Sequence, residues 1–183
     1  MLEGIDPTVK GILVALAVLA AGPLLVLLEK RKANVARELC FSTKNFPQSV
    51  LAGMVLFAKV FLVLIALGII AKLTGFNDST KVIALLRNQS IVMLFVIATV
   101  APIGEELLFR GYLQKKVGVF FSSIVFAAVH IGYGSIFELA GAFAAGMVFG
   151  EHVRRTKRTL PAIIAHSLLN AWAIFVAYYL FTP

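Results

Sequence analysis

The sequence predicts an all-α fold, a polytopic transmembrane bundle of about six spans with room for interfacial helices between them. Its residues are 60% hydrophobic and only 14% charged, and its mean hydropathy is +0.94. A soluble domain is typically about 45–50% apolar and about 25% charged, so this composition excludes an ordinary soluble fold. The length suits one compact membrane domain, residues 1–183.

Six apolar stretches are predicted as spans, and crossing a bilayer takes about 20 residues of helix. The fourth stretch is short and reaches only about 22 Å, so we expect it inside the bundle or beside thinned lipid. The polar connections 29–44 and 74–89 each suit a short helix at the membrane surface. In the fifth stretch, small residues recur every four positions at Ala142, Gly146 and Gly150, a spacing that permits close helix contact. The predicted spans are residues 9–28, 48–73, 90–116, 117–131, 136–153 and 159–181.

The net charge of +8 lies in short loops between the apolar stretches, so we expect the lipid bilayer as a partner and no nucleic acid. Basic loops stay in the cytoplasm and meet anionic lipid. The loops after the first, third and fifth spans hold eleven lysines and arginines, and the opposite side holds four. In a cell membrane the basic loops should therefore be cytoplasmic and both termini outside; no feature of the sequence sets an oligomeric state. The eleven are Lys30, Arg31, Lys32, Arg37, Lys44, Lys115, Lys116, Arg154, Arg155, Lys157 and Arg158.

Two adjacent carboxylates and a guanidinium lie inside the third predicted span, at Glu105, Glu106 and Arg110. Each charge near the centre of a bilayer costs about 2.5–3.5 kcal/mol on insertion scales, and such residues are usually functional. One explanation is that the three charges neutralise one another and hold helices together. The other is that they build a site.

Helical geometry separates the two carboxylates. Glu106 and Arg110 are four residues apart, so they share a helix face and can form a charge-assisted ion pair. Glu105 is rotated by about 100° from Glu106, so Arg110 is not its natural partner. This predicts a structural pair and one remaining carboxylate that can serve as a general base or acid.

Two later spans contribute further polar groups. His130 ends an apolar helix, and His166 and Asn170 are four residues apart on one helix face. These side chains fit a reaction in which Glu105 activates a water molecule. One histidine would hold the water, and a histidine–asparagine pair would stabilise a tetrahedral oxyanion. The chemistry would be peptide hydrolysis inside a membrane. A divalent metal such as zinc stays open, because Glu105, His130 and His166 are acceptable ligand types.

At these residues the chain resembles the CAAX protease and bacteriocin-processing family (CPBP, or ABI), the type II CAAX prenyl endopeptidase-like intramembrane proteases. The resemblance covers residues 100–172, within a family-like catalytic core of about residues 90–181. Three motifs carry it, in order: Glu-Glu-x-x-x-Arg at Glu105, Glu106 and Arg110, Phe-x-x-x-His at Phe126 and His130, and His-x-x-x-Asn at His166 and Asn170.

The resemblance implies a glutamate-dependent intramembrane endopeptidase, a hydrolase that acts on membrane-associated peptide or protein substrates. It assigns activation of water to Glu105 with His130, and the oxyanion site to His166 and Asn170. It gives the Glu106–Arg110 pair a supporting role in the helix.

Two alternatives belong to other classes. One is a non-proteolytic bacteriocin-immunity or scaffold protein of the membrane that keeps the motif. The other is a small proton-linked transporter that uses Glu105 and the histidines as relay groups, although the sequence has no inverted repeat of the kind many transporters carry. We expect Glu138 to lie near the outer rim of the bundle, with a part in the cavity as the alternative.

Overall fold

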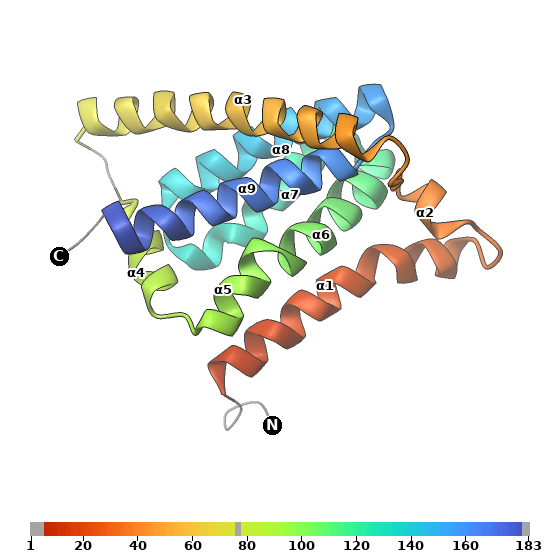
Figure 1. Cartoon of the computed structure of the whole chain (residues 1–183), viewed down its shortest axis with the longest axis horizontal. Helices are drawn as coiled ribbons and strands as arrows, with labels where there is room; N and C mark the ends of the chain where they lie inside the picture. The colour runs from red at the N-terminus through yellow and green to blue at the C-terminus, as the bar shows by residue number, and fades with distance from the viewer. Residues whose placement is uncertain (1–5, 76–77, 181–183) are drawn as a thin grey trace.

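The computed structural model describes residues 6–75 and 78–180, and every regular element within them is helical (Figure 1), which confirms the all-α prediction. Three of the elements are short 3₁₀ or π segments that continue a neighbouring α-helix. In chain order the elements are α1 (Pro7–Glu29), α2 (Val35–Glu38), α3 (Phe46–Leu73), α4 (Thr80–Arg87), α5 (Ile91–Ala98), α6 (Val100–Glu106), η1 (Leu107–Leu113), α7 (Gln114–Val129), η2 (His130–Tyr133), α8 (Ile136–Thr156), α9 (Leu160–Phe175) and η3 (Val176–Leu180).

Among the described residues, five helical stretches are long and apolar enough to cross a membrane, and the longest, Ile91–Tyr133, contains both the third and the fourth predicted spans. Gly118 divides this stretch, because its φ of 82° and ψ of 172° interrupt α7, and a positive φ favours glycine. The chain reverses there. The Ser122 hydroxyl donates a hydrogen bond to the Phe109 carbonyl at 2.9 Å, whereas a straight helix would separate these two residues by about 20 Å. The six predicted spans are thus five helical stretches, one of which is folded back on itself.

The basic loops gather at one end of the bundle, around α2 (Figure 1). Lys116 forms an ion pair with Glu29 at 2.7 Å, which joins the loops after the first and third predicted spans. Arg158 donates to the Lys44 carbonyl at 3.0 Å, which joins the loop after the fifth span to the same end. The three loops that were predicted to share one side of the membrane therefore lie together.

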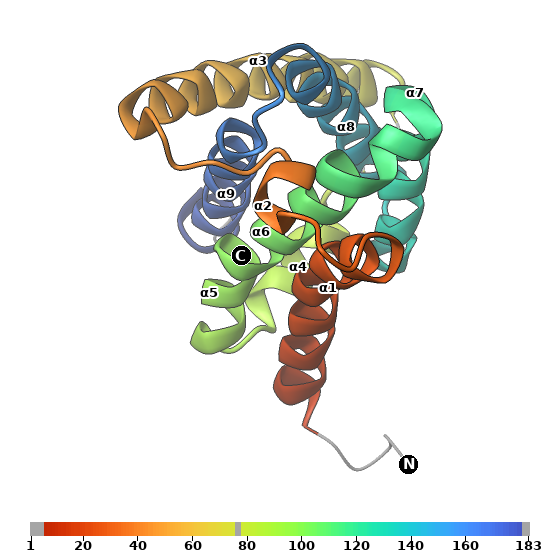
Figure 2. The same ribbon diagram turned by 90° about the vertical axis from the view of Figure 1, so that its right-hand side faces the viewer.

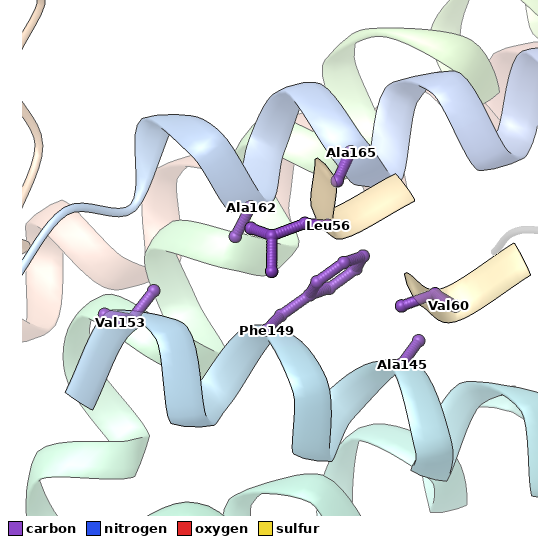
Figure 3. Packing of buried hydrophobic residues seen from close by; sticks show 7 residues of the cluster. All are labelled: Leu56, Val60, Ala145, Phe149, Val153, Ala162 and Ala165. Atoms are coloured by element: carbon purple, nitrogen blue, oxygen red, sulfur yellow. The ribbon is translucent and has the colours of Figure 1, made fainter. Parts of the chain in front are cut away.

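Helix α6, which carries the acidic motif, lies between α1 and α9 (Figure 2). On the other side of α9, the fully buried ring of Phe149 on α8 packs among Leu56 and Val60 of α3 and Ala162 and Ala165 of α9 (Figure 3). Because lipid is as apolar as these side chains, the stabilisation comes from close packing rather than from exclusion of water. This cluster fixes α9, and with it His166, against α8.

Small residues set the closest helix contacts. A Cβ atom at Gly104 would lie 2.7 Å from the backbone nitrogen of Leu19, so glycine is what allows α6 to pack against the backbone of α1 immediately before Glu105. A Cβ atom at Gly146 would lie 2.9 Å from the Cβ of Ser123 on α7. The predicted close contact along the small-residue positions of α8 is therefore present, and α7 is its partner.

The two predicted surface helices differ in extent. The connection 74–89 contains the eight-residue α4, and the connection 29–44 contains only the four-residue α2. Helix α4 is held at both ends, since Lys81 donates to the Gly134 carbonyl at 2.8 Å and Arg87 donates to the Ala177 carbonyl at 2.6 Å. It therefore bridges the start of α8 and the end of α9.

Candidate active site

The acidic motif lies between two departures from regular α-helix. Thr99, with φ −128° and ψ −63°, separates α5 from α6, and Pro102, which has no backbone N–H to donate, follows it. Directly after Glu106 the chain continues as the π-helix η1. Such π segments often occur at functional sites, so the backbone conformation also indicates a site at this position.

Glu106 and Arg110 form the predicted ion pair. Arg110 Nε lies 3.2 Å from Glu106 Oε2, and the two side chains are 1% and 0% exposed. The guanidinium carbon also lies 4.0 Å from the centroid of the Phe126 ring, a distance at which a cation and a ring attract each other. The guanidinium makes no hydrogen bond to the described residues. The buried charge of Arg110 is therefore balanced by Glu106 and the aromatic ring.

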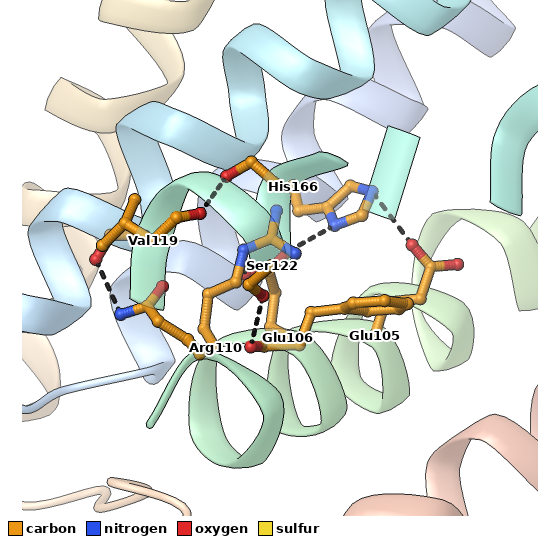
Figure 4. A network of polar contacts seen from close by, with 10 residues as sticks. Glu105, Glu106, Arg110, Val119, Ser122 and His166 are labelled. Carbon is orange, nitrogen blue, oxygen red and sulfur yellow. Dashed lines mark hydrogen bonds and ion pairs between the residues drawn. The ribbon is translucent and has the colours of Figure 1, made fainter. Parts of the chain in front are cut away.

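His166 connects the two carboxylates across helices (Figure 4). Its Nδ1 lies 3.0 Å from Glu106 Oε1, and its Nε2 lies 3.8 Å from Glu105 Oε2. An ionised carboxylate only accepts hydrogen bonds, so the Nδ1 of His166 carries the proton of the shorter contact. Glu106 thus orients a histidine of another helix in addition to pairing with Arg110, a contact that sequence spacing did not predict.

Glu105 is the free carboxylate. Its side chain is 22% exposed, its Oε2 has no hydrogen-bond partner among the described residues, and it forms no ion pair with Arg110 there. The geometric separation of Glu105 from the Glu106–Arg110 pair, expected from the helical rotation, is present in the structure.

His130 ends α7 and is oriented by its own helix. Its Nδ1 lies 2.8 Å from the Phe126 carbonyl. A carbonyl oxygen only accepts, so Nδ1 carries the proton and Nε2 is left with a lone pair. The imidazole packs against the Phe126 ring at 4.7 Å and stacks on Tyr133 at 5.6 Å between ring centroids. The Phe-x-x-x-His spacing therefore fixes the tautomer and the orientation of His130.

Asn170 fastens α9 to the interrupted third stretch. Its Nδ2 donates to the Ile97 carbonyl at 2.8 Å, two residues before the break at Thr99. One N–H of the amide remains for another acceptor.

A cavity of about 600 Å³ joins these side chains, since Glu105, His130, His166 and Asn170 all line it. Most of its remaining wall is apolar and comes from α3, α4, α8 and α9. The structure therefore brings the four candidate residues to one space, as the sequence predicted. It adds Tyr133 and Glu138.

Glu138, on the first turn of α8, also lines the cavity, which was the alternative to a position at the outer rim. The sequence motif Ser-x-x-Glu at Ser135 and Glu138 suggests a helix cap and gives no sign that the carboxylate faces a cavity. The start of α8 is instead capped by Asp78, a residue of a distant segment.

Asp78 caps the start of α8 from outside that helix. Its carboxylate accepts from the Ile136 N–H at 2.7 Å, the Ser135 hydroxyl at 2.8 Å and the Phe137 N–H at 3.2 Å. Loss of water around the carboxylate acts to raise its pKa. The hydrogen bonds from Ile136, Ser135 and Phe137, with the charge of Lys81, outweigh that effect and lower the pKa below its ordinary value. Asp78 is therefore anionic at neutral pH, and its negative charge interacts favourably with the positive end of the α8 helix dipole.

The described residues include no group of three His, Cys, Asp or Glu side chains placed to hold a metal ion. Of the candidate ligands, Glu105 and His166 lie 3.8 Å apart, and the His166 Nδ1 is taken by Glu106. The geometry of the described residues thus does not fit a three-ligand metal site.

Comparison with known proteins agrees with the motifs. Residues 87–172, which contain all three, match the family described as Type II CAAX prenyl endopeptidase Rce1-like. The chain is 31% identical over 108 residues to the "Putative membrane peptidase YdiL" of Bacillus subtilis (55% of this chain, 43% of the relative), and 34% identical over 65 residues to the "UPF0177 protein YxdF" of Lactococcus lactis (33% and 34%). The chain thus matches less than half the length of these curated relatives. No solved structure matches it.

Proposed function

We propose that this multi-pass membrane protein, whose residues 87–172 match the family of Rce1-like type II CAAX prenyl endopeptidases, is an intramembrane endopeptidase in which Glu105 activates the attacking water. The family match supports a peptidase that works in the lipid bilayer on membrane-associated substrates. The observation that carries the choice of base is the free Glu105 carboxylate, which lines the cavity beside His166 and outside the Glu106–Arg110 pair.

In the first step, Glu105 takes a proton from a water molecule while the water oxygen attacks the carbonyl carbon of the scissile peptide bond. His130 holds that water, because its Nδ1–H is committed to the Phe126 carbonyl and its Nε2 lone pair can accept a hydrogen bond. A carbon–oxygen bond forms, the carbonyl π electrons move to its oxygen, and a tetrahedral oxyanion results.

In the second step, His166 and Asn170 stabilise the oxyanion. The His166 Nδ1–H is committed to Glu106, so Nε2 can donate only when the imidazole carries a second proton and a positive charge. The carboxylates of Glu105 and Glu106 flank the ring and favour that charge. The remaining amide N–H of Asn170 is a second donor. The proton on Glu105 then passes to the leaving nitrogen as the C–N bond breaks, which yields a carboxylic acid and an amine and restores the Glu105 carboxylate.

The test is cleavage of a peptide substrate embedded in lipid vesicles by the purified protein. Glu105→Gln keeps the shape of the side chain and removes the base, so cleavage should fall by about 10²–10⁴-fold. His130→Ala and His166→Ala should also lose activity. The matched control is Glu151→Gln, an exposed carboxylate of α8 paired with Arg154, which should cleave like the wild type. Undiminished cleavage by all three site variants would overturn the mechanism. Proton uptake by vesicles without any cleavage would favour the transporter alternative.

The orientation in the membrane follows from the charge distribution. We propose that the basic end around α2 faces the cytoplasm and that α4 and both termini lie outside. The support is the excess of eleven basic residues over four, together with the contacts that gather the three basic loops at one end.

A further inference from the structure

The cavity contains a second carboxylate that the proposed reaction does not use. Glu138, on the first turn of α8, lines the same cavity as Glu105, His130 and His166. Its carboxylate makes no hydrogen bond or ion pair with the residues that the structure describes, and its backbone N–H donates to the Ser135 hydroxyl at 3.1 Å. A carboxylate without a partner in a largely apolar cavity is costly, so its presence here calls for a ligand.

The cap of α8 does not use the Glu138 carboxylate among the described residues. In a Ser-x-x-Glu capping box the glutamate carboxylate reaches back to the backbone N–H of the serine. In this chain Asp78 supplies the acceptors for the start of α8, and Lys81 binds the Gly134 carbonyl beside it. The helix start is thus stabilised by the connection that precedes α4, and Glu138 is free to face the cavity.

The cavity holds two carboxylates, Glu138 and Glu105, against the single positive charge that the proposed mechanism gives His166. Glu138 lies within electrostatic range of Glu105, His130 and His166, and Tyr133 lies within range of both carboxylates. No lysine or arginine is among the described residues that line the cavity. Two carboxylates that share a largely apolar space repel each other, and a cation that enters between its walls relieves this repulsion.

We propose that Glu138 is a specificity-determining residue that binds a cationic group of the substrate, a lysine or arginine side chain close to the scissile bond. This inference rests on the proposed peptidase function, and it adds the class of substrate. The carboxylate would replace the water lost by the cation with a charge-assisted bond, and the apolar walls of α3 and α4 would hold the stem of the same side chain.

The experiment compares lipid-embedded peptides that differ at one residue near the cleavage site, which is lysine, methionine or glutamate. The wild type should cleave the lysine peptide about 10–100-fold more efficiently than the methionine peptide, as a hydrogen bond to a charged group predicts. Glu138→Gln should bring this ratio close to one. Glu138→Lys should reverse the order, so that the glutamate peptide is preferred. Glu151→Gln, on the same helix and outside the cavity, should keep the wild-type ratio.

Binding of the same peptides to Glu105→Gln protein separates this inference from the proposed function. If no peptide is cleaved by the wild type but binding still prefers lysine and follows the residue at position 138, the peptidase proposal fails and the cation site stands. If the wild type cleaves the methionine and lysine peptides equally, or if Glu138→Lys leaves the order unchanged, the cation site is refuted while the peptidase proposal stands. A merely structural role for Glu138 would lower all three rates together and could not reverse their order.

Discussion

Replacing Glu106 by glutamine tests whether the buried ion pair holds the site together. Glutamine keeps an oxygen that can accept from His166, but it leaves Arg110, 1% exposed, without its counter-ion. At 3.2 Å and an effective dielectric constant of about 20, two unit charges attract by about 5 kcal/mol. Breaking one partner of a buried pair costs about 3–5 kcal/mol in measured cases, so we expect the free energy of unfolding to fall by that amount.

The assay is reversible unfolding of purified protein in mixed micelles, with Glu106→Gln compared with Glu106→Gln/Arg110→Met. The double variant is neutral and apolar at the pair, so it should recover most of the lost stability. Glu151→Gln makes the same chemical change in an exposed pair and should have a far smaller effect, because solvent screens that pair. A loss below about 1 kcal/mol for Glu106→Gln, or a double variant as unstable as the sum of the single changes, would refute the reasoning.

Two further predictions concern the ends of the bundle. The pKa of Asp78 is lower in the folded protein than in the unfolded chain. Asp78 therefore stabilises the start of α8 fully above the ordinary aspartate pKa of about 3.9. This stabilisation is lost as the pH falls from there through the lowered pKa of the folded state. The stability difference between wild type and Asp78→Asn, measured by unfolding across that range, should therefore shrink on acidification, and a constant difference would contradict the cap. For the orientation, a cysteine introduced at Lys157 in a Cys40→Ser background should react with an impermeant thiol reagent only after the membrane is opened, whereas labelling in intact cells would place the basic end outside.

Patterns that depend on local geometry were predictable from the sequence. Hydropathy indicates the spanning stretches, and spacing of four residues places Glu106 beside Arg110 and His166 on the same helix face as Asn170. The rotation between adjacent residues separates Glu105 from that pair. Each of these follows from the dimensions of one helix, and each is present in the structure.

Contacts between distant segments were not predictable in the same way. The bond from His166 to Glu106, the placement of Asp78 at the start of α8 and the release of Glu138 into the cavity all require knowledge of which helices are neighbours. The fold-back at Gly118 depends on one backbone conformation inside an apolar stretch, where hydropathy is uniform on both sides. The sequence could indicate a boundary there but not the direction in which the chain continues.

The order in which the chain is synthesised gives the Glu106–Arg110 pair a further consequence. The two residues emerge from the ribosome almost together, whereas His166 follows sixty residues later. A helix that enters the membrane with its opposite charges already paired presents a dipole rather than two separate ions, and so avoids part of the insertion cost of each charge. The third stretch can thus be accommodated in lipid before α9 exists to complete the site. The pair that lies beneath the assembled site would then also act during synthesis, by lowering the cost of inserting this charged helix into the membrane.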